Sequence, residues 1–245
     1  MIITKLGAVA STNRYCEALD LSEVEDFTCF WALTQTAGIG QRGNVWHSAP
    51  GQNLTFSLVL HPDFLPAERQ FLLTETLALA LCDFLSIFNF DSSIHIKWPN
   101  DIYIAGHKIC GTLTSAHLSV LSSQLSVLSS AICGIGLNVN ETDFPDWLPN
   151  PTSLTLLTGQ HYELEPLLKK LLSCIEKRYT ALQSGIDPEP DYLARLMNLN
   201  TPARYLYNNE EITATITGID PHGRLLLTTA DGQSLSCGMK EIAFL

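Results

Sequence analysis

The segment Lys97-Trp98-Pro99-Asn100-Asp101-Ile102-Tyr103, followed after two residues by Gly106-His107-Lys108-Ile109-Cys110-Gly111, concentrates positive charge in a chain that has little of it. Between Tyr15 and Leu168 the chain has only four lysines and arginines, namely Arg42, Arg69, Lys97 and Lys108. Arg69 falls in a predicted helix, whereas the other three lie in segments punctuated by glycine and proline. A single lysine in a turn is usually a solvated side chain, but three of four cations beside glycine-rich turns favour an anion-binding site.

Residues 94–98 alternate between apolar and polar side chains, which predicts a half-buried strand that ends at Pro99. Residues 102–104 and 108–114 flank a turn at 105–107, so we expect an antiparallel hairpin. Asn100 and Asp101 precede it at a turn, where their side chains can bond backbone or a ligand. Two of the scarce lysines therefore lie in one short hairpin.

The composition describes a globular chain with a sizeable core. It has 245 residues, of which 46% are hydrophobic and 16% are charged, enough for one large domain or for one large and one small domain. The formal net charge is -11, so the diffuse positive field that attracts nucleic acid or anionic lipid is absent. We expect no nucleic acid and no membrane partner.

The cysteines and the N-terminus favour a cytoplasmic location. Seven cysteines are scattered without a Cys-x-x-Cys pair, which is typical of buried thiols in a reducing compartment. The seven histidines are equally dispersed and predict no zinc site. The first residues lack the apolar core of a signal peptide, and no apolar run approaches the ~20 residues of a membrane span.

The order of the predicted elements indicates an α/β (α+β) domain followed by a small all-β domain. Strands are expected at 30–33, 53–60 and in the hairpin, and helices from Ser11-Thr12-Asn13 to about Leu19, from Pro66 to about Phe88, from Pro166 to about Gly185 and over 192–197. From about Asn200 onward only short strands and turns remain. We therefore predict a domain over 1–197 and a small β-barrel over 198–245.

The segment Gly38-Ile39-Gly40-Gln41-Arg42-Gly43 matches Gly-x-Gly-x-x-Gly. A dinucleotide-binding fold needs a helix directly after that motif, but residues 44–51 cannot start one and a strand follows. The alternatives are a flexible surface loop with a core Trp46, or a glycine loop whose backbone N–H groups surround an anion. In the second case Arg42 adds a fixed charge and Trp46 stacks on a planar group.

Residues 131–140 alternate cleanly between two faces. Ile135, Leu137 and Val139 point one way, whereas Gly134, Gly136, Asn138 and Asn140 point the other. Core packing explains the apolar face, and the glycine–asparagine face leaves space for a flat polar ligand. Between this strand and the hairpin, Leu118-Ser-Val-Leu-Ser-Ser recurs at Leu125, and we expect this repeat to form the distal part of a second hairpin without chemistry of its own.

One reaction class suits this set of residues, namely the attack of a carboxylate on the α-phosphate of ATP. The set combines a few cations with glycine-bearing strand ends and several amides, and it contains few general bases. Two anions at ~4 Å repel by about 4 kcal/mol at an effective dielectric of ~20. Lysine, arginine, Mg²⁺ and backbone N–H groups offset that repulsion. The substrate is itself the nucleophile, so no catalytic serine or cysteine is required.

At these residues the sequence resembles a biotin protein ligase nearly end to end. The motifs that carry the resemblance are Ser11-Thr12-Asn13, Gln35-Thr-Ala-Gly-x-Gly-x-Arg-Gly43 with Trp46, Lys97-Trp-Pro-Asn-Asp101, Lys108-x-x-Gly111, Gly134-Ile-Gly-x-Asn138 and Gly218-Ile-Asp-x-x-Gly-x-Leu225. The resemblance implies a class II aminoacyl-tRNA-synthetase-like mixed sheet flanked by helices, plus a small SH3-like barrel. It implies that biotin and MgATP give biotinyl-5′-adenylate, and that a lysine of a biotin carboxyl carrier protein then takes the biotinyl group.

The family's site residues carry over by motif, with Lys108 and Arg42 as the catalytic groups. Biotin is then expected to contact Ser11, Thr12, Asn13, Gln35, Gly38, Ile39, Gly40, Gln41, Arg42, Gly43, Lys108, Gly111 and Gly136. ATP is expected to contact Arg42, Trp46, Lys97, Asn100, Asp101, Lys108 and Asn138. No protein metal site is expected beyond the Mg²⁺ that accompanies ATP.

The chain departs from the family pattern at two places. Ile39 stands where the family usually has arginine, and Thr112-Leu113-Thr114-Ser115 stands where it often has Ile-Leu-x-Glu. Two other functions stay open: a lipoate ligase, which shares the fold and the adenylation, and a non-catalytic biotin-binding relative. Larger relatives carry a DNA-binding domain before this core, and since this chain begins at the core we expect no repressor role. Exposed sheet edges allow a homodimer.

Overall fold

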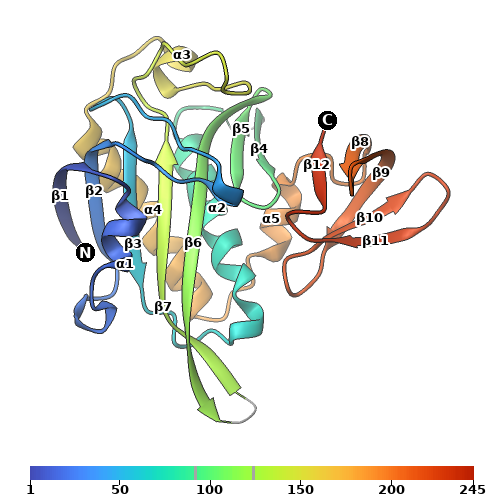
Figure 1. Ribbon diagram of the computed structural model, residues 1–245, viewed down its shortest axis with the longest axis horizontal. Helices are drawn as coiled ribbons and strands as arrows, with labels where there is room; N and C mark the ends of the chain where they lie inside the picture. The colour runs from blue at the N-terminus through green and yellow to red at the C-terminus, as the bar shows by residue number, and fades with distance from the viewer. Residues whose placement is uncertain (91–92, 123–124) are drawn as a thin grey trace.

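The computed structural model describes residues 1–90, 93–122 and 125–245, and the side chains of residues 42, 121, 122 and 125 lie outside the described part. Its larger sheet has the order β1-β2-β3-β7-β6-β5-β4 (Figure 1). The strands are β1 (Ile2–Val9), β2 (Thr28–Gln35), β3 (Leu54–Leu60), β4 (Ile94–Lys97), β5 (Asp101–Ile104), β6 (His107–Ser122) and β7 (Leu125–Leu137). Only β1 and β2 pair in parallel among these neighbours, so the predicted mixed sheet is confirmed.

β3 lies at the centre of the sheet, and all seven of its residues are buried. Its alternate side chains divide between two layers, because successive residues of a strand point to opposite faces. Leu54, Phe56, Leu58 and Leu60 belong to the main core. Val59 packs instead in a smaller cluster with Cys16. Thr55 and Ser57 share that second face, which is therefore polar at the end where the candidate site lies.

Helices cover both faces of the sheet (Figure 1). They are α1 (Thr12–Glu17), α2 (Phe71–Ser86), α3 (Leu154–Thr158), α4 (Leu164–Gln183) and α5 (Glu189–Arg195). α2 packs on α4 and contacts β4, β5 and β6, whereas α1 contacts β2, β3 and β7 on the opposite face. Within the described residues, no helix has both the length and the apolar character needed to cross a membrane.

The predicted helix positions hold, but several ends differ. The segment after Pro66 first forms a 3-10 turn, Ala67–Arg69, before α2 begins, and α4 begins two residues ahead of Pro166. α5 spans 189–195 instead of 192–197. Two further 3-10 turns are Leu21–Glu23 and Gln41–Gly43.

The first side chains of α1 do not cap the helix. Ser11 occupies the N-cap position in an extended conformation, but its side chain makes no capping hydrogen bond. The backbone N–H of Thr12 donates instead to Gln35 Oε1 at 2.7 Å. A residue from the end of β2 thus satisfies the helix start, a contact that local sequence cannot reveal.

β6 and β7 form the long hairpin expected around the serine-rich repeat (Figure 1). Leu118 pairs with Leu128 and Ser119 with Val127, so the two copies of the repeat lie opposite each other. Residues 123–124, which are the last residue of the first copy and the residue between the copies, lie outside the described part. β7 extends further back than predicted and ends at Leu137, before Asn138 and Asn140.

The C-terminal residues form a separate antiparallel sheet of order β11-β10-β9-β8-β12. Its strands are β8 (Pro202–Tyr207), β9 (Glu210–Ile219), β10 (Leu225–Thr229), β11 (Ser234–Cys237) and β12 (Ile242–Phe244). Its closure into a barrel and the domain boundary at residue 197 stay predictions.

Trp98, which follows β4, and Phe71 on α2 both lie against Gly223, between β9 and β10. Trp98 Nε1 donates to the Gly223 carbonyl at 3.0 Å, and a Cβ at Gly223 would overlap the ring of Phe71. The C-terminal sheet therefore packs directly on the segment 97–103.

Candidate active site

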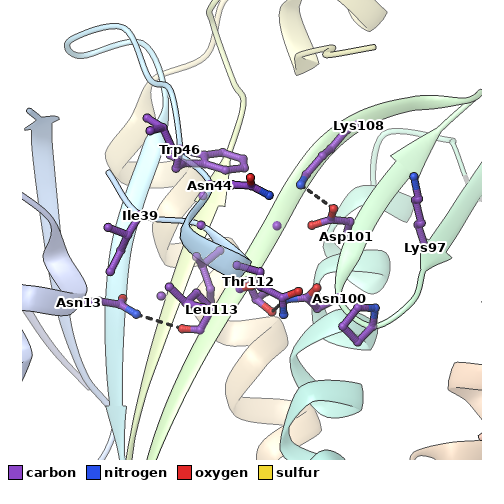
Figure 2. A pocket seen from close by; sticks show the side chains of 18 of the residues that line it. Asn13, Ile39, Asn44, Trp46, Lys97, Asn100, Asp101, Lys108, Thr112 and Leu113 are labelled. Atoms are coloured by element: carbon purple, nitrogen blue, oxygen red, sulfur yellow. Dashed lines mark hydrogen bonds and ion pairs between the residues drawn. The ribbon is translucent and has the colours of Figure 1, made fainter. Parts of the chain in front are cut away.

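A cleft of about 300 Å³ opens on the α1 face of the large sheet (Figure 2). The predicted site residues that line it are Ser11, Thr12, Asn13, Gln35, Ile39, Gly40, Gln41, Trp46, Lys97, Asn100, Asp101, Lys108, Gly111 and Gly136. Gly38, Gly43 and Asn138 do not line it, and the side chain of Arg42 lies outside the described part. Residues far apart in sequence thus meet in one cleft.

Amide and hydroxyl groups form one end of the cleft. Gln35 Oε1 accepts from the N–H of Thr12, and Asn13 Nδ2 donates to the Leu113 carbonyl at 3.1 Å. Ser57 Oγ lies 2.7 Å from Thr12 Oγ1 and 2.6 Å from Asn13 Oδ1. We name Ser11, Thr12, Asn13 and Gln35 the amide corner. Thr12 and Gln35 are hydrogen-bonded to each other, and Asn13 is held by Ser57 and the Leu113 carbonyl, so these three side chains are ordered without a ligand.

A missing side chain in β7 makes room for this corner. A Cβ at Gly134 would overlap the amide group of Asn13. The glycine face that the sequence predicted for this strand is therefore occupied by the site's own residues.

The glycine loop folds back on itself as a small hairpin over residues 38–46. Ile39 pairs with Val45 as an antiparallel bridge. The N–H of Gly40 donates to the Asn44 carbonyl at 2.7 Å, and the N–H of Trp46 donates to the Gly38 carbonyl at 3.0 Å. These two N–H groups cannot donate to an anion as predicted, because both already donate to carbonyl groups inside the loop.

Trp46 lies over the second glycine of β7. A Cβ at Gly136 would overlap the indole ring, so only glycine permits this approach. Trp46 Nε1 is buried and has no hydrogen-bond partner among the described residues. A buried N–H without a partner costs about 1–3 kcal/mol, so this donor is suited to an acceptor on a ligand.

The two lysines of the first hairpin lie in the cleft with Asp101 (Figure 2). Lys108 Nζ lies 2.6 Å from Asp101 Oδ2 and 5.8 Å from the centre of the Trp46 ring. A Cβ at Gly111 would come within 2.9 Å of Asp101 Oδ1 and 3.4 Å of Lys108 Cε. Gly111 therefore gives the ion pair its space.

Lys97 lies between two aromatic rings from different sheets. Its Nζ is 5.4 Å from the centre of the Tyr103 ring and 5.2 Å from that of Phe244. Partial burial lowers the pKa of Lys97, Lys108 lowers it further, and Asp101 opposes both effects. A bound phosphate group would raise the pKa of Lys97 again, since an added anion favours the charged form of the lysine.

Asn100 and Asn138 serve the framework in this structure. Asn100 Nδ2 donates to the Thr112 carbonyl, and the residue is 2% exposed. Asn138 Nδ2 donates to the Thr152 carbonyl at 2.9 Å outside the cleft lining. Their predicted contact with ATP remains a prediction.

Several lining residues were missed by the sequence analysis. They are Asn44, Val45, Trp98, Pro99, Thr112, Leu113, Gly134, Ile135, Ile242, Ala243 and Phe244. Most of them neighbour predicted residues, so the motifs already pointed to their segments. The three residues of β12 could not be predicted in this way, because the sequence of a short apolar strand does not indicate which surface it packs against.

The comparisons with known proteins agree with this geometry. Residues 6–135 match the model of the biotin/lipoate A/B protein ligase family, and residues 203–238 match the biotin protein ligase C-terminal domain. The bifunctional ligase/repressor BirA of Bacillus subtilis is 33% identical over 229 residues, covering 91% of this chain and 68% of that protein. The biotin–[acetyl-CoA-carboxylase] ligase of Paracoccus denitrificans is 30% identical over 243 residues, covering 94% and 95%.

The structural comparison extends over the whole chain. The biotin protein ligase of Aquifex aeolicus in complex with biotin and ATP superposes with a TM-score of 0.80 at 25% identity, covering 100% of this chain and 98% of that one. Two family models, a relative matched over 95% of its length and a shared fold therefore lead to one conclusion: this chain belongs to the biotin/lipoate A/B protein ligase family, within the biotin protein ligases.

Proposed function

We propose that the protein adenylates biotin with MgATP and transfers the biotinyl group to a lysine of a biotin carboxyl carrier protein. The observation that carries the proposal is the cleft, in which the amide corner and the two lysines flank Trp46. An uncharged polar ring fits an end made of amides and hydroxyls, whereas phosphates fit an end that carries lysines. The carboxyl group of the ligand would lie between them.

In the first step, a carboxylate oxygen of biotin attacks the α-phosphorus of ATP and pyrophosphate leaves. Lys108 is the proposed catalytic residue, because its ammonium group can contact both anions as they approach. Asp101 holds it in position by the 2.6 Å ion pair. Lys97 is placed to bind the phosphates, and Arg42 is proposed to order the glycine loop around the adenylate.

In the second step, the amine of the carrier lysine attacks the acyl carbon of the mixed anhydride and AMP leaves. The ligand must therefore stay accessible from outside, and the exposed Val45 lies at the rim of the cleft. Mg²⁺ is proposed to arrive on the phosphates of ATP, where it supplies charge neutralisation. In the described part of the chain, no group of three or more His, Cys, Asp or Glu residues is placed to hold a metal ion.

Incubation with biotin, MgATP and an isolated carrier domain tests the proposal. Mass spectrometry is expected to show one biotinyl group added to the carrier, dependent on ATP and abolished when the target lysine is arginine. An unmodified carrier would reject the transfer step.

Biotin-dependent exchange of pyrophosphate into ATP tests the first step separately. Its absence would favour a non-catalytic biotin-binding protein. Competition between labelled biotin and lipoate distinguishes the two ligases of the family, and preferential use of lipoate would overturn the choice of biotin.

Two further proposals concern the setting of the enzyme. All seven cysteines are free thiols in the described structure, which supports a reducing compartment such as the cytoplasm. The edge strands β1 and β4 of the large sheet support a homodimer, to be tested by sedimentation.

A further inference from the structure

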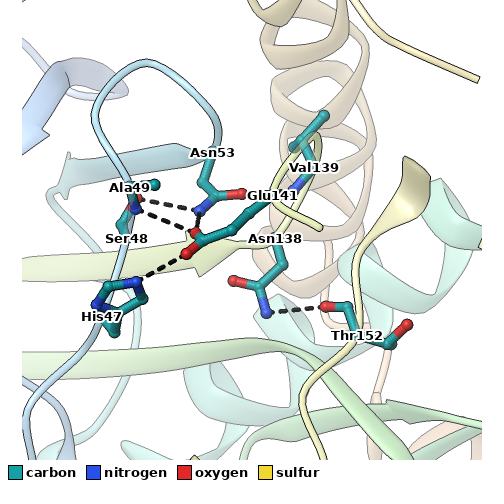
Figure 3. Close-up of polar contacts among 8 residues, drawn as sticks. All are labelled: His47, Ser48, Ala49, Asn53, Asn138, Val139, Glu141 and Thr152. Carbon is teal, nitrogen blue, oxygen red and sulfur yellow. Dashed lines mark hydrogen bonds and ion pairs between the residues drawn. The ribbon is translucent and has the colours of Figure 1, made fainter. Parts of the chain in front are cut away.

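A buried carboxylate lies behind the glycine loop, outside the cleft (Figure 3). Glu141 follows the end of β7 and is only 3% exposed. His47 Nε2 lies 2.7 Å from its Oε1, while the N–H of Ala49, at 3.0 Å, and the side chain of Asn53 both donate to its Oε2. We name His47, Ala49, Asn53 and Glu141 the loop anchor.

The loop anchor joins the end of one strand to the start of another. Asn53 precedes β3, and its Oδ1 accepts from the Val139 N–H at 2.8 Å. The Asn140 N–H donates to the Gln52 carbonyl at 2.8 Å. The segment that leads from the loop into β3 is therefore fixed to the segment that follows β7.

The loop anchor is connected to the cleft by a single peptide bond, the one between Trp46 and His47. His47 directly follows Trp46, whose ring lies against Gly136 and beneath Lys108 Nζ. Trp147 makes a T-shaped contact with the His47 ring, with the ring centres 6.2 Å apart. His47 is held on both sides, and the backbone of Trp46 is held with it.

We propose that Glu141 is a positioning residue, which holds the glycine loop in its cleft-forming shape before any ligand arrives. Its carboxylate accepts from two donors and contacts the His47 ring, and all three partners lie between residues 47 and 53, directly after the loop. Its removal would leave buried donors without an acceptor, which destabilises this arrangement of the loop. The loop would then open, and a ligand would have to order it again at the expense of affinity.

The consequence for biotin rests on the proposed function, but the consequence for the loop does not. Hydrogen exchange of the free protein reports on the loop directly, through the amides of Gly40, Asn44 and Trp46, each of which is hydrogen-bonded inside the loop. Biotin affinity and the KM for biotin then report on the cost of ordering it. A loss of positioning is expected to raise the KM for biotin, while kcat at saturating biotin is retained.

Three variants and one control provide the test. Glu141→Ala is expected to speed exchange of the loop amides at least tenfold and to weaken biotin binding about tenfold. Glu141→Gln keeps one carboxamide oxygen for the Ala49 and Asn53 donors and an amino group for the His47 ring, so it is expected to restore most of both losses. His47→Ala removes one partner and is expected to be intermediate. Asp83→Ala is the control: Asp83 on α2 is also a partly buried carboxylate, and it pairs with Arg178 on α4, across the sheet from the cleft.

The outcomes separate positioning from general stability. Loop exchange at the wild-type rate in Glu141→Ala overturns the proposal, as does equal acceleration in Asp83→Ala. If Glu141→Ala does not fold, unchanged loop exchange in both Glu141→Gln and His47→Ala overturns it, and acceleration in His47→Ala alone supports it. If the wild-type protein does not bind biotin, the proposed function is refuted. The hydrogen-exchange result then tests the role of the loop anchor by itself.

Discussion

Lys108 and Gly111 face the same side of β6 although they are three positions apart in the sequence. In a regular strand an odd spacing places two residues on opposite faces. Here Cys110 pairs with Ile102 and Lys108 with Tyr103, so Ile109 is an extra residue and forms a bulge. The side chain of Ile109 is fully buried, while Lys108 turns back to the cleft. The bulge is what brings Lys108 to Asp101.

Lys108 is expected to be essential for the rate of adenylation. Lys108→Ala removes the ammonium group that would meet the developing negative charge, at a cost of on the order of 10²–10³ in kcat. Biotin-dependent pyrophosphate exchange measures it. Lys169→Ala is the matched control, because Lys169 pairs with Glu165 on the surface of α4 and is expected to behave like the wild type. A near-normal rate for Lys108→Ala would make Lys108 merely a turn lysine.

Gly136 is expected to tolerate no side chain. Gly136→Ala places a methyl group into the ring of Trp46, so the loop must move and biotin affinity is expected to fall more than tenfold. Titration calorimetry measures the affinity. Gly7→Ala in β1 is the control, since an added Cβ there meets nothing within 4 Å. Equal affinities for the two variants would contradict the close approach of Trp46 to β7.

Ile39 is expected to weaken the hold on the adenylate, because it stands where relatives usually have arginine. It lines the cleft within the loop hairpin and offers no charge to the intermediate. Ile39→Arg is expected to slow release of biotinyl-5′-adenylate severalfold. A rapid-filtration measurement of release gives the rate, and Ile39→Leu serves as the uncharged control. An unchanged rate in Ile39→Arg would reject the idea.

The stability of the protein is expected to fall between about pH 4.5 and pH 8 through Glu75. Burial, helped by Glu189 and Asp187 and opposed by Arg69, raises the pKa of Glu75 to about 8 from its usual 4.5. Its Oε2 is buried without a hydrogen-bond partner among the described residues. Between those values the unfolded chain loses this proton and the folded chain keeps it, so the free energy of unfolding decreases as the pH rises.

Glu75→Gln removes that dependence while keeping the size of the side chain. The variant and the wild type are expected to differ little at pH 5, and the difference is expected to shift in favour of the variant by a few kcal/mol at pH 8. Urea denaturation at the two pH values measures it. The same difference in unfolding free energy at both would show that Glu75 keeps its ordinary pKa.

Local sequence determined the elements because their causes are local. Pro99 ends a strand whose residues alternate by period two, and the apolar spacing of α2 and α4 follows the helical repeat. Gly134 and Gly136 could be placed on one face from that same period, and both lie against site residues. The motifs likewise placed most of the cleft-lining residues, because a ligand needs particular side chains at particular strand ends.

Only the tertiary structure decided which groups those side chains contact. Gln35 caps α1 from a distance of 23 residues in sequence, and Glu141 holds His47 from a distance of 94. Asn138 bonds Thr152 instead of facing the cleft, and Phe244 reaches Lys97 from the second sheet. Such pairings depend on how the sheets twist and pack. The local sequence of a segment does not specify which surface the segment contacts after folding.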